Sequence, residues 1–119
     1  MNTLPSIRVG IGHLARRLGV SIRTLRFYEE AGLVQAERGR RREERTFDAD
    51  ECRTLEQVVA LRAVGLSVRQ IGELIAIDQD TEDYRAKLAA ALSQVLAEKI
   101  REVRAIEHLL SSARASGVE

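Results

Sequence analysis

The sequence predicts a mainly helical protein, in which a head of short helices precedes one long helix. From residue 84 to about residue 113 no glycine or proline interrupts the chain. The composition also favours helices, since 31% of the 119 residues are charged and only 3% are aromatic. Near the amino end, apolar residues recur at the i, i+3, i+4, i+7 spacing of an amphipathic helix, and they are Ile11, Leu14, Ala15 and Leu18.

Charge is distributed unevenly along the chain. Residues 1–47 contain ten Arg and five Glu, a net charge of +5, whereas residues 48–119 carry a net charge of −4. A basic head is the electrostatic footprint expected of a nucleic-acid-binding protein. Seventeen of the 19 basic residues are Arg, the better bidentate phosphate ligand. A GC-rich genome explains the same bias equally well, so the arginine excess alone does not decide between the two.

The first two helices are separated by a tight turn. Gly19 ends the first helix, because glycine adopts a left-handed backbone at little cost. Val20 is the apolar residue between the helices, and the Ser21 hydroxyl is placed to cap the second helix. Within that helix, Ile22 and Leu25 share one face, and either Tyr28 or Glu29 is the next residue on it. This is the layout of a helix-turn-helix, whose second helix presents its outer face to a DNA major groove.

The second helix carries the candidate DNA-binding residues of the head. An arginine there can bind guanine O6 and N7 or a phosphate oxygen. Aromatic side chains can contact thymine methyl groups, sugars or phosphates. The candidates are Ser21, Arg23, Thr24, Arg26, Phe27 and Tyr28. We expect Arg26 to interact partly with Glu29, Glu30 or phosphate. An ordinary helical hairpin with a solvated basic face is the alternative interpretation.

The segment IGHLARRLGVSIRTLRFYEEAGLV resembles the opening of the MerR family of bacterial transcription regulators. The family pattern is close to I-G-x-L-A, then G-V-S/T, then T-L-R-[FY]-Y-[ED]-x-x-G-L. His13 departs from the usual acidic residue, and a surface role is expected for it. The residues that match in register are Thr24, Leu25, Arg26, Phe27, Tyr28, Glu29, Gly32 and Leu33.

A polar, arginine-rich stretch follows over residues 34–46. It has no apolar stripe that could seat a helix, which favours a β-hairpin or a loop. In the MerR family a small wing with an arginine-rich tip occupies this place, and the resemblance makes Arg45 a phosphate contact. Arg40, Arg41 and Arg42 are further candidates. Glu43 and Glu44 replace the family's Gly-Tyr, so a disordered, solvated charge run stays open as an alternative.

Two more helices are predicted after the wing. Asp48 and Glu51 have the spacing of a capping box, and Gly65 ends the helix that they begin. Its predicted apolar face consists of Leu55, Val58, Val59, Leu61 and Val64. Cys52, in its first turns, is expected to be a small buried or half-buried hydrophobe.

Ser67 and Gln70 form the next capping pair, ahead of an apolar face made by Val68, Ile71, Leu74 and Ile75. The segment LRAVGLSVRQIGELI resembles the family's second helical pair, which acts as a second wing over the DNA backbone. The resemblance makes Arg62 and Arg69 candidate phosphate contacts. Simple exposure on a helix surface explains both residues equally well.

The long carboxy-terminal helix has an apolar stripe along most of its length. A helix of about 30 residues measures roughly 45 Å, too long to bury one stripe against so small a domain. We therefore expect a coiled coil between two chains, and the family resemblance implies an antiparallel pair. An intramolecular helical pair is the alternative. The predicted dimerisation residues are Leu88, Leu92, Val95, Leu96, Ile100, Val103, Ile106 and Leu110.

These patterns divide the chain into four parts. We expect a winged helix-turn-helix DNA-binding domain over 7–77, a linker over 78–83, a dimerisation helix over 84–113 and a tail over 114–119. The fold class is mainly α.

Metal, cofactor and enzymatic roles find no support in the sequence. A single cysteine allows neither an intramolecular disulfide nor a thiolate metal site within one chain. No catalytic constellation or phosphate-binding glycine loop is present, so no enzyme activity and no cofactor are expected. No signal peptide or membrane-spanning run is recognisable, which predicts a soluble, cytoplasmic protein without a membrane partner.

The leading hypothesis is a MerR-type transcription regulator. The resemblance implies a homodimer that binds a pseudo-palindromic operator in double-stranded DNA, then bends and untwists promoter DNA so that both promoter elements face RNA polymerase. The alternative is a coiled-coil interaction protein that modulates another regulator and has little DNA affinity of its own. Glu43, Glu44 and the acidic second half motivate that alternative.

Overall fold

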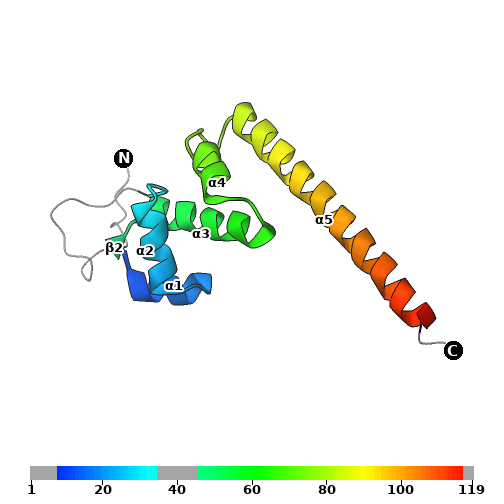
Figure 1. Ribbon diagram of the computed structural model, residues 1–119. Coiled ribbons are helices and arrows are strands. Elements are labelled where there is room, and N and C mark those ends of the chain that lie inside the picture. The colour runs from blue at the N-terminus through cyan, green and yellow to red at the C-terminus, as the bar shows by residue number, and fades with distance from the viewer. Residues whose placement is uncertain (1–7, 35–45, 117–119) are drawn as a thin grey trace. The chain divides into compact units, whose positions relative to one another are not determined.

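A computed structural model describes residues 8–34 and 46–116 of the chain (Figure 1). The chain divides into two compact units, Met1–Asp78 and Gln79–Glu119. The second unit contains one helix, α5 (Glu82–Ser116). The elements described in the first unit are β1 (Val9–Gly10), α1 (Ile11–Leu18), α2 (Ile22–Glu30), β2 (Thr46–Phe47), α3 (Ala49–Val64) and α4 (Val68–Ile75). The predicted mainly α fold class is confirmed.

Helices α1 and α2 form the predicted helix-turn-helix. Gly19 adopts a left-handed backbone with φ 73°, and the N–H of Val20 donates to the carbonyl of Ala15 at 3.0 Å, which closes α1. Ser21 then caps α2, because its Oγ accepts a hydrogen bond from the Thr24 N–H at 3.0 Å. Ile22 differs from the prediction, since it is 41% exposed rather than part of the inner face.

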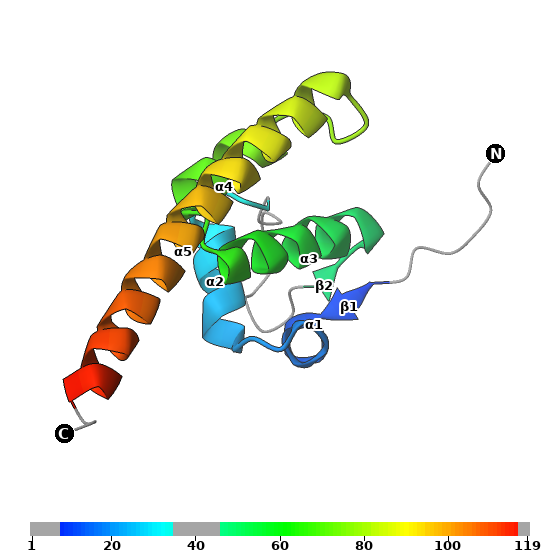
Figure 2. The same cartoon turned by 90° about the vertical axis from the view of Figure 1, so that its right-hand side faces the viewer.

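Strands β1 and β2 pair antiparallel, with Val9 opposite Phe47 and Gly10 opposite Thr46. Figure 2 shows the two strands side by side, next to the start of α1. Strand β1 leads directly into α1, whose first residue is Ile11. The Phe47 side chain is fully buried, so this short ladder is anchored to the core.

Helices α3 and α4 begin with the two predicted capping boxes. The Asp48 carboxylate accepts from the Glu51 N–H at 2.8 Å, and the Glu51 carboxylate accepts from the Asp48 N–H at 2.9 Å. Ser67 and Gln70 repeat this exchange at the start of α4. Each box satisfies backbone donors that a helix start leaves unpaired. Val64 is 41% exposed at the end of α3, contrary to the prediction that it lies on the apolar face.

The core of the first unit draws on nearly all of its elements. Helix α1 packs against α2 and α3, and α3 packs against α4 and β2. Burial of a leucine side chain contributes about 1.5–3 kcal/mol, so the fully buried side chains supply much of the unit's stability. The largest fully buried side chains are Phe47, Leu14, Leu25, Leu55, Leu66, Ile71 and Val58.

Helix α5 runs without interruption for 35 residues. It begins at Glu82, two residues earlier than predicted, and ends at Ser116 rather than near residue 113. The Thr81 hydroxyl explains the earlier start, because its Oγ1 accepts a hydrogen bond from the Tyr84 N–H at 3.2 Å. Acidic residues in the first turn also favour a helix start there.

Candidate nucleic-acid interface

Helix α2 presents polar and apolar residues on its outer side. Arg23 is exposed and the Phe27 side chain is 52% exposed, while Leu25 between them is fully buried. The buried leucine fixes the rotation of the helix, so that Arg23 and Phe27 are held at the surface. An exposed arginine beside an exposed aromatic ring suits contacts with base edges and thymine methyl groups.

The hydroxyl groups at the start of α2 are engaged in holding the helix. Besides accepting the Thr24 N–H, the Ser21 Oγ donates to the Thr24 Oγ1 at 3.0 Å. Thr24 is half-buried, whereas Ser21 is exposed. These two predicted DNA-binding residues therefore order the first turn of α2, the end of a recognition helix that contacts base edges.

Tyr28 lies in the core rather than on the outer face of α2. Its side chain is 6% exposed, and its ring centroid lies 5.8 Å from that of Phe27. Burial places Tyr28 on the inner face with Leu25, whereas the neighbouring Phe27 ring lies at the surface. A DNA contact for Tyr28 stays a prediction, and little of the side chain is at the surface to make it.

Arg26 is half-buried, and its Nε atom is fully buried. Within the described part of the chain, this Nε has no hydrogen-bond partner. A buried donor without an acceptor costs about 1–3 kcal/mol, more for a charged group. The expected interaction of Arg26 with Glu29 or Glu30 stays a prediction.

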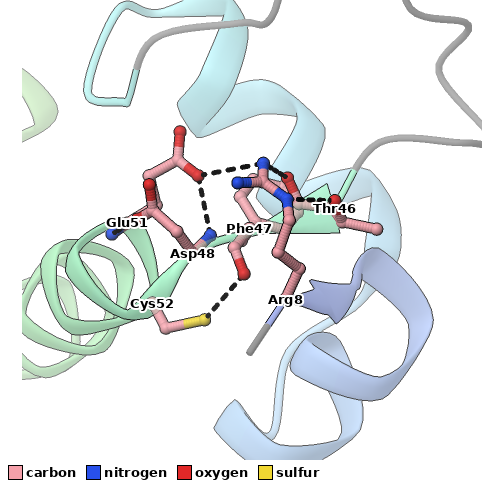
Figure 3. A network of polar contacts seen from close by, with 6 residues as sticks. All are labelled: Arg8, Thr46, Phe47, Asp48, Glu51 and Cys52. Atoms are coloured by element: carbon pink, nitrogen blue, oxygen red, sulfur yellow. Dashed lines mark hydrogen bonds and ion pairs between the residues drawn. The ribbon is translucent and has the colours of Figure 1, made fainter. Parts of the chain in front are cut away.

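A network of polar contacts ties the two strands to the start of α3 (Figure 3). The Arg8 guanidinium donates to the Thr46 Oγ1 at 2.7 Å and to the Thr46 carbonyl at 3.0 Å, and it lies 3.9 Å from the Glu51 carboxylate. Strand β2 begins at Thr46, directly after residues 35–45, which belong to the predicted wing. Arg8 was not among the predicted site residues; it lies directly before β1, which brings it next to Thr46 of the paired strand. Arg40, Arg41, Arg42 and Arg45 lie outside the described residues.

Cys52 completes this network at the core side. Its Sγ donates weakly to the Phe47 carbonyl at 3.7 Å, and the residue is buried, as predicted. Burial raises the pKa of the Cys52 thiol above its ordinary value of 9.0; Arg17 opposes the rise, and Asp48 and Glu51 add to it. The thiol is therefore protonated at neutral pH, which makes it a poor nucleophile and metal ligand.

Arg62 and Arg69, the two candidates near α4, lie in different environments. The Arg62 Nη1 donates to the Leu66 carbonyl at 3.0 Å, so the side chain links the end of α3 to the start of α4. Arg69 is far more exposed, at 89% of its side chain, and its Nε lies 3.7 Å from the Glu73 carboxylate. Arg62 therefore stabilises the connection between α3 and α4, whereas the Arg69 side chain is exposed enough to contact a phosphate.

The predicted dimerisation residues lie on one stripe of α5. Leu88, Leu92 and Val95 are half-buried. The other five are exposed to between 42% and 61%, and they are Leu96, Ile100, Val103, Ile106 and Leu110. Leu109, which was not predicted, is 68% exposed beside them. An exposed apolar stripe of this length marks an interaction surface.

No three His, Cys, Asp or Glu side chains within 8–34 and 46–116 are grouped so that they could hold a metal ion. None of the described helices is both long enough and apolar enough to cross a membrane.

The profile of the MerR HTH family regulatory proteins matches residues 10–76, which span the helix-turn-helix, the strands, α3 and α4. The chain belongs to the MerR family. Its membership agrees with the resemblance carried by the helix-turn-helix segment, and it makes the chain a transcription regulator of that family.

Characterised MerR relatives match most of the chain. The heavy metal-dependent transcription regulator 2 of Rhizobium meliloti (strain 1021) is 31% identical over 101 residues, which cover 85% of this chain and 69% of that protein. The HTH-type transcriptional regulator HmrR of Rhizobium leguminosarum bv. viciae is 31% identical over 109 residues, which cover 86% of this chain and 84% of its own.

Solved structures of MerR proteins share the fold. HiNmlR, a MerR family regulator that lacks the sensor domain, was crystallised bound to promoter DNA; it is 25% identical, with a TM-score of 0.64 over 92% of this chain and 89% of its own. A MerR regulator from Bacillus cereus superposes with a TM-score of 0.70 over 95% of this chain and 85% of its own, at 22% identity. These comparisons give no support to the alternative of an interaction protein with little DNA affinity.

Proposed function

We propose that this MerR regulator binds double-stranded operator DNA as a homodimer and bends and untwists promoter DNA. One observation carries the proposal. In the capped helix α2, Arg23 and Phe27 are exposed, whereas Leu25, which lies between them in sequence, is buried. Support comes from HiNmlR, which shares this architecture and was crystallised with promoter DNA.

Arg23 and Phe27 are the proposed base-reading residues. Arg23 is fully available at the surface for a bidentate contact with guanine, and the Phe27 ring is available for a thymine methyl group or a sugar. The buried Nε of Arg26 fixes that side chain by packing, and we propose that its terminal nitrogens bind phosphate. Ser21 and Thr24 hold the helix end that enters the groove.

Phosphate contacts around this helix position the head on the duplex. Arg69 is the proposed contact from α4, because its only partner among the described residues is an exposed, weak ion pair with Glu73. Arg62 is proposed to contribute mainly through the link that it makes to Leu66. From the wing we propose Arg40, Arg41, Arg42 and Arg45, whose charge suits backbone binding.

The dimer follows from the exposed stripe of α5. Two copies that pair along this stripe remove its leucines and isoleucines from water, at about 25 cal/mol per Å² of apolar surface. Two heads related by a two-fold axis require two half-sites, hence a pseudo-palindromic operator. Bending such a site costs about 1–6 kcal/mol, which the contacts of both heads offset. RNA polymerase at the promoter, in the cytoplasm, is the proposed downstream partner.

The test is a titration of purified protein against duplex DNA from the promoter region upstream of its own gene. Wild-type affinity should fall steeply with salt, since each neutralised phosphate contributes a slope of about −0.9. Arg23→Ala should lower specific affinity by about 1–3 kcal/mol and relax selectivity at one or two base pairs.

Arg101→Ala is the matched control, because Arg101 is an exposed arginine on α5, outside the head. It should leave specific binding unchanged. Equal effects of the two substitutions, or an affinity that does not respond to salt, would contradict the assignment of α2 as the reading helix.

A further inference from the structure

Two exposed side chains, one from each helix, meet at the start of the helix-turn-helix. Ile22 is the first residue of α2, and it is 41% exposed. Arg16 is an exposed residue of α1 that was not among the predicted site residues. A Cβ atom at Gly12 would lie 3.9 Å from the Ile22 Cδ1 and 3.8 Å from the Arg16 Nη1. The apolar end of one side chain and the charged end of the other are therefore neighbours over Gly12.

Ile22 lies on the outer side of α2. At about 100° per residue, Ile22, Arg23 and Phe27 fall within an arc of about 140° around the helix axis. The buried Leu25 and Tyr28 fall on the other side. A single exposed isoleucine is ordinary on a protein surface. This one stands at the first residue of the reading helix, the end that contacts base edges in a helix-turn-helix.

The chemistry of the Ile22 side chain limits what it can read. A branched hydrocarbon neither donates nor accepts a hydrogen bond, and the thymine 5-methyl group is the apolar group that base pairs present in the major groove. Consecutive Cα atoms lie about 3.8 Å apart, close to the rise of about 3.4 Å per base pair. A thymine that contacts Ile22 therefore lies within about two base pairs of the guanine that Arg23 is proposed to bind.

The Arg16 guanidinium is available to an anion. Within residues 8–34 and 46–116 it makes no hydrogen bond or ion pair. In a helix-turn-helix the first helix crosses the DNA backbone while the second lies in the major groove. A guanidinium on the first helix, next to the first residue of the second, lies at the edge of that groove, where it can bind a phosphate oxygen.

We propose that Ile22 and Arg16 form one DNA contact across Gly12, in which Ile22 meets a thymine methyl group and Arg16 binds a neighbouring phosphate. The inference rests on the proposed function and deepens it, because it adds a thymine that each half-site must carry and a contact from α1. Gly12 leaves room for the contact, since a side chain longer than a methyl group there would displace the ends of the other two.

Replacement of thymine by uracil tests the methyl contact, because it removes the 5-methyl group and keeps the base pairing. The probe is duplex DNA from the promoter region upstream of the chain's own gene, with each thymine replaced in turn. With the wild-type chain, replacement at one position in each half-site should weaken binding by about three- to tenfold. Ile22→Ala should bind the unmodified duplex more weakly by a similar factor, and that position should no longer respond to uracil.

Val64→Ala is the matched control, because Val64 is also 41% exposed but ends α3. Its response to uracil should equal that of the wild type. Ile22→Val keeps the branched side chain and should keep the response. A response that survives in Ile22→Ala and disappears in Phe27→Ala would assign the methyl contact to Phe27 and overturn the proposal.

The two proposals fail in different ways. Specific binding by the wild-type chain without a response to uracil at any position would overturn the thymine contact and leave the proposed function intact. A wild-type chain that binds the promoter duplex no better than a duplex of unrelated sequence would overturn the proposed function itself.

A salt titration tests the phosphate contact. Arg16→Ala should make the slope of log affinity against log salt shallower by about 0.9 for each head and leave base selectivity unchanged. Arg17→Ala is the matched control, because Arg17 is also an exposed arginine of α1 but lines a cavity with Cys52 and Arg53 of α3. It should leave the slope unchanged. Equal slopes in the two variants would refute the contact from Arg16.

Discussion

Arg8 and Thr46 are joined by two hydrogen bonds, one to the Thr46 Oγ1 at 2.7 Å and one to its carbonyl at 3.0 Å. The residues are 38 positions apart in sequence, and Thr46 directly follows the segment that carries the proposed wing arginines. A charged donor with two acceptors resists displacement better than a single neutral hydrogen bond does. One side chain therefore fixes the chain at the residue where this segment ends.

Replacement of Arg8 by alanine should remove this contact. Two charge-assisted hydrogen bonds at a partly exposed site are lost, and we expect the free energy of unfolding to fall by about 1–3 kcal/mol. Thermal unfolding followed by circular dichroism measures the change. Arg53→Ala is the control, because Arg53 makes an exposed ion pair with Asp50 and should cost less than about 1 kcal/mol. If both variants unfold alike, Arg8 has no special role.

Removal of the Ser21 hydroxyl should destabilise the reading helix. Ser21→Ala takes away the acceptor of the Thr24 N–H and should cost about 1 kcal/mol, typical of a lost N-cap. DNA affinity measured well below the melting temperature should fall as well, because the first turn of α2 frays. Ser116→Ala, at the far end of α5, removes only a hydroxyl bonded to the Ser112 carbonyl and should change neither quantity.

Alanine substitutions of Arg62 and Arg69 should separate an effect on stability from an effect on DNA binding. Arg62→Ala leaves the Leu66 carbonyl without its side-chain donor and should lower stability by about 1 kcal/mol. Arg69→Ala should leave stability within about 0.5 kcal/mol and reduce the salt slope of DNA binding by roughly one phosphate contact. Urea unfolding and salt titrations measure the two effects. A loss of stability in the Arg69 variant would contradict this division.

Stability should decline at alkaline pH because of Cys52. Burial raises the pKa of its thiol, so the folded chain holds this proton more tightly than the unfolded chain does. The contribution is therefore fully present below pH 9.0 and is lost as pH rises from there through the raised pKa. Urea unfolding between pH 8 and pH 10 measures the slope. In Cys52→Ala the slope over this interval should be shallower, and an unchanged slope would refute the assignment.

Local signals in the sequence were sufficient to predict the ends of most of the helices. Gly19 and Ser21 mark the turn between α1 and α2, and the Asp48–Glu51 box marks the start of α3, because helix ends are set by hydrogen bonds between residues a few positions apart. Helix α5 begins two residues before its predicted start, because Thr81 caps it. This cap is also a local contact, but it was not recognised in the sequence. The family motif located the candidate reading helix.

Tertiary packing decided what the periodicity left open. The periodicity put Ile22 on the inner face and left Tyr28 or Glu29 open as a further member of that face. Packing leaves Ile22 exposed and buries Tyr28, because a short helix is rotated by the whole set of its neighbours. The bond from Arg8 to Thr46 spans a separation of 38 positions, over which no sequence pattern operates. The sequence by itself determined where helices begin and end, through contacts local to the chain. Only the tertiary structure decided which arginines are bonded within the head and which stay exposed, because that choice depends on partners brought close by folding.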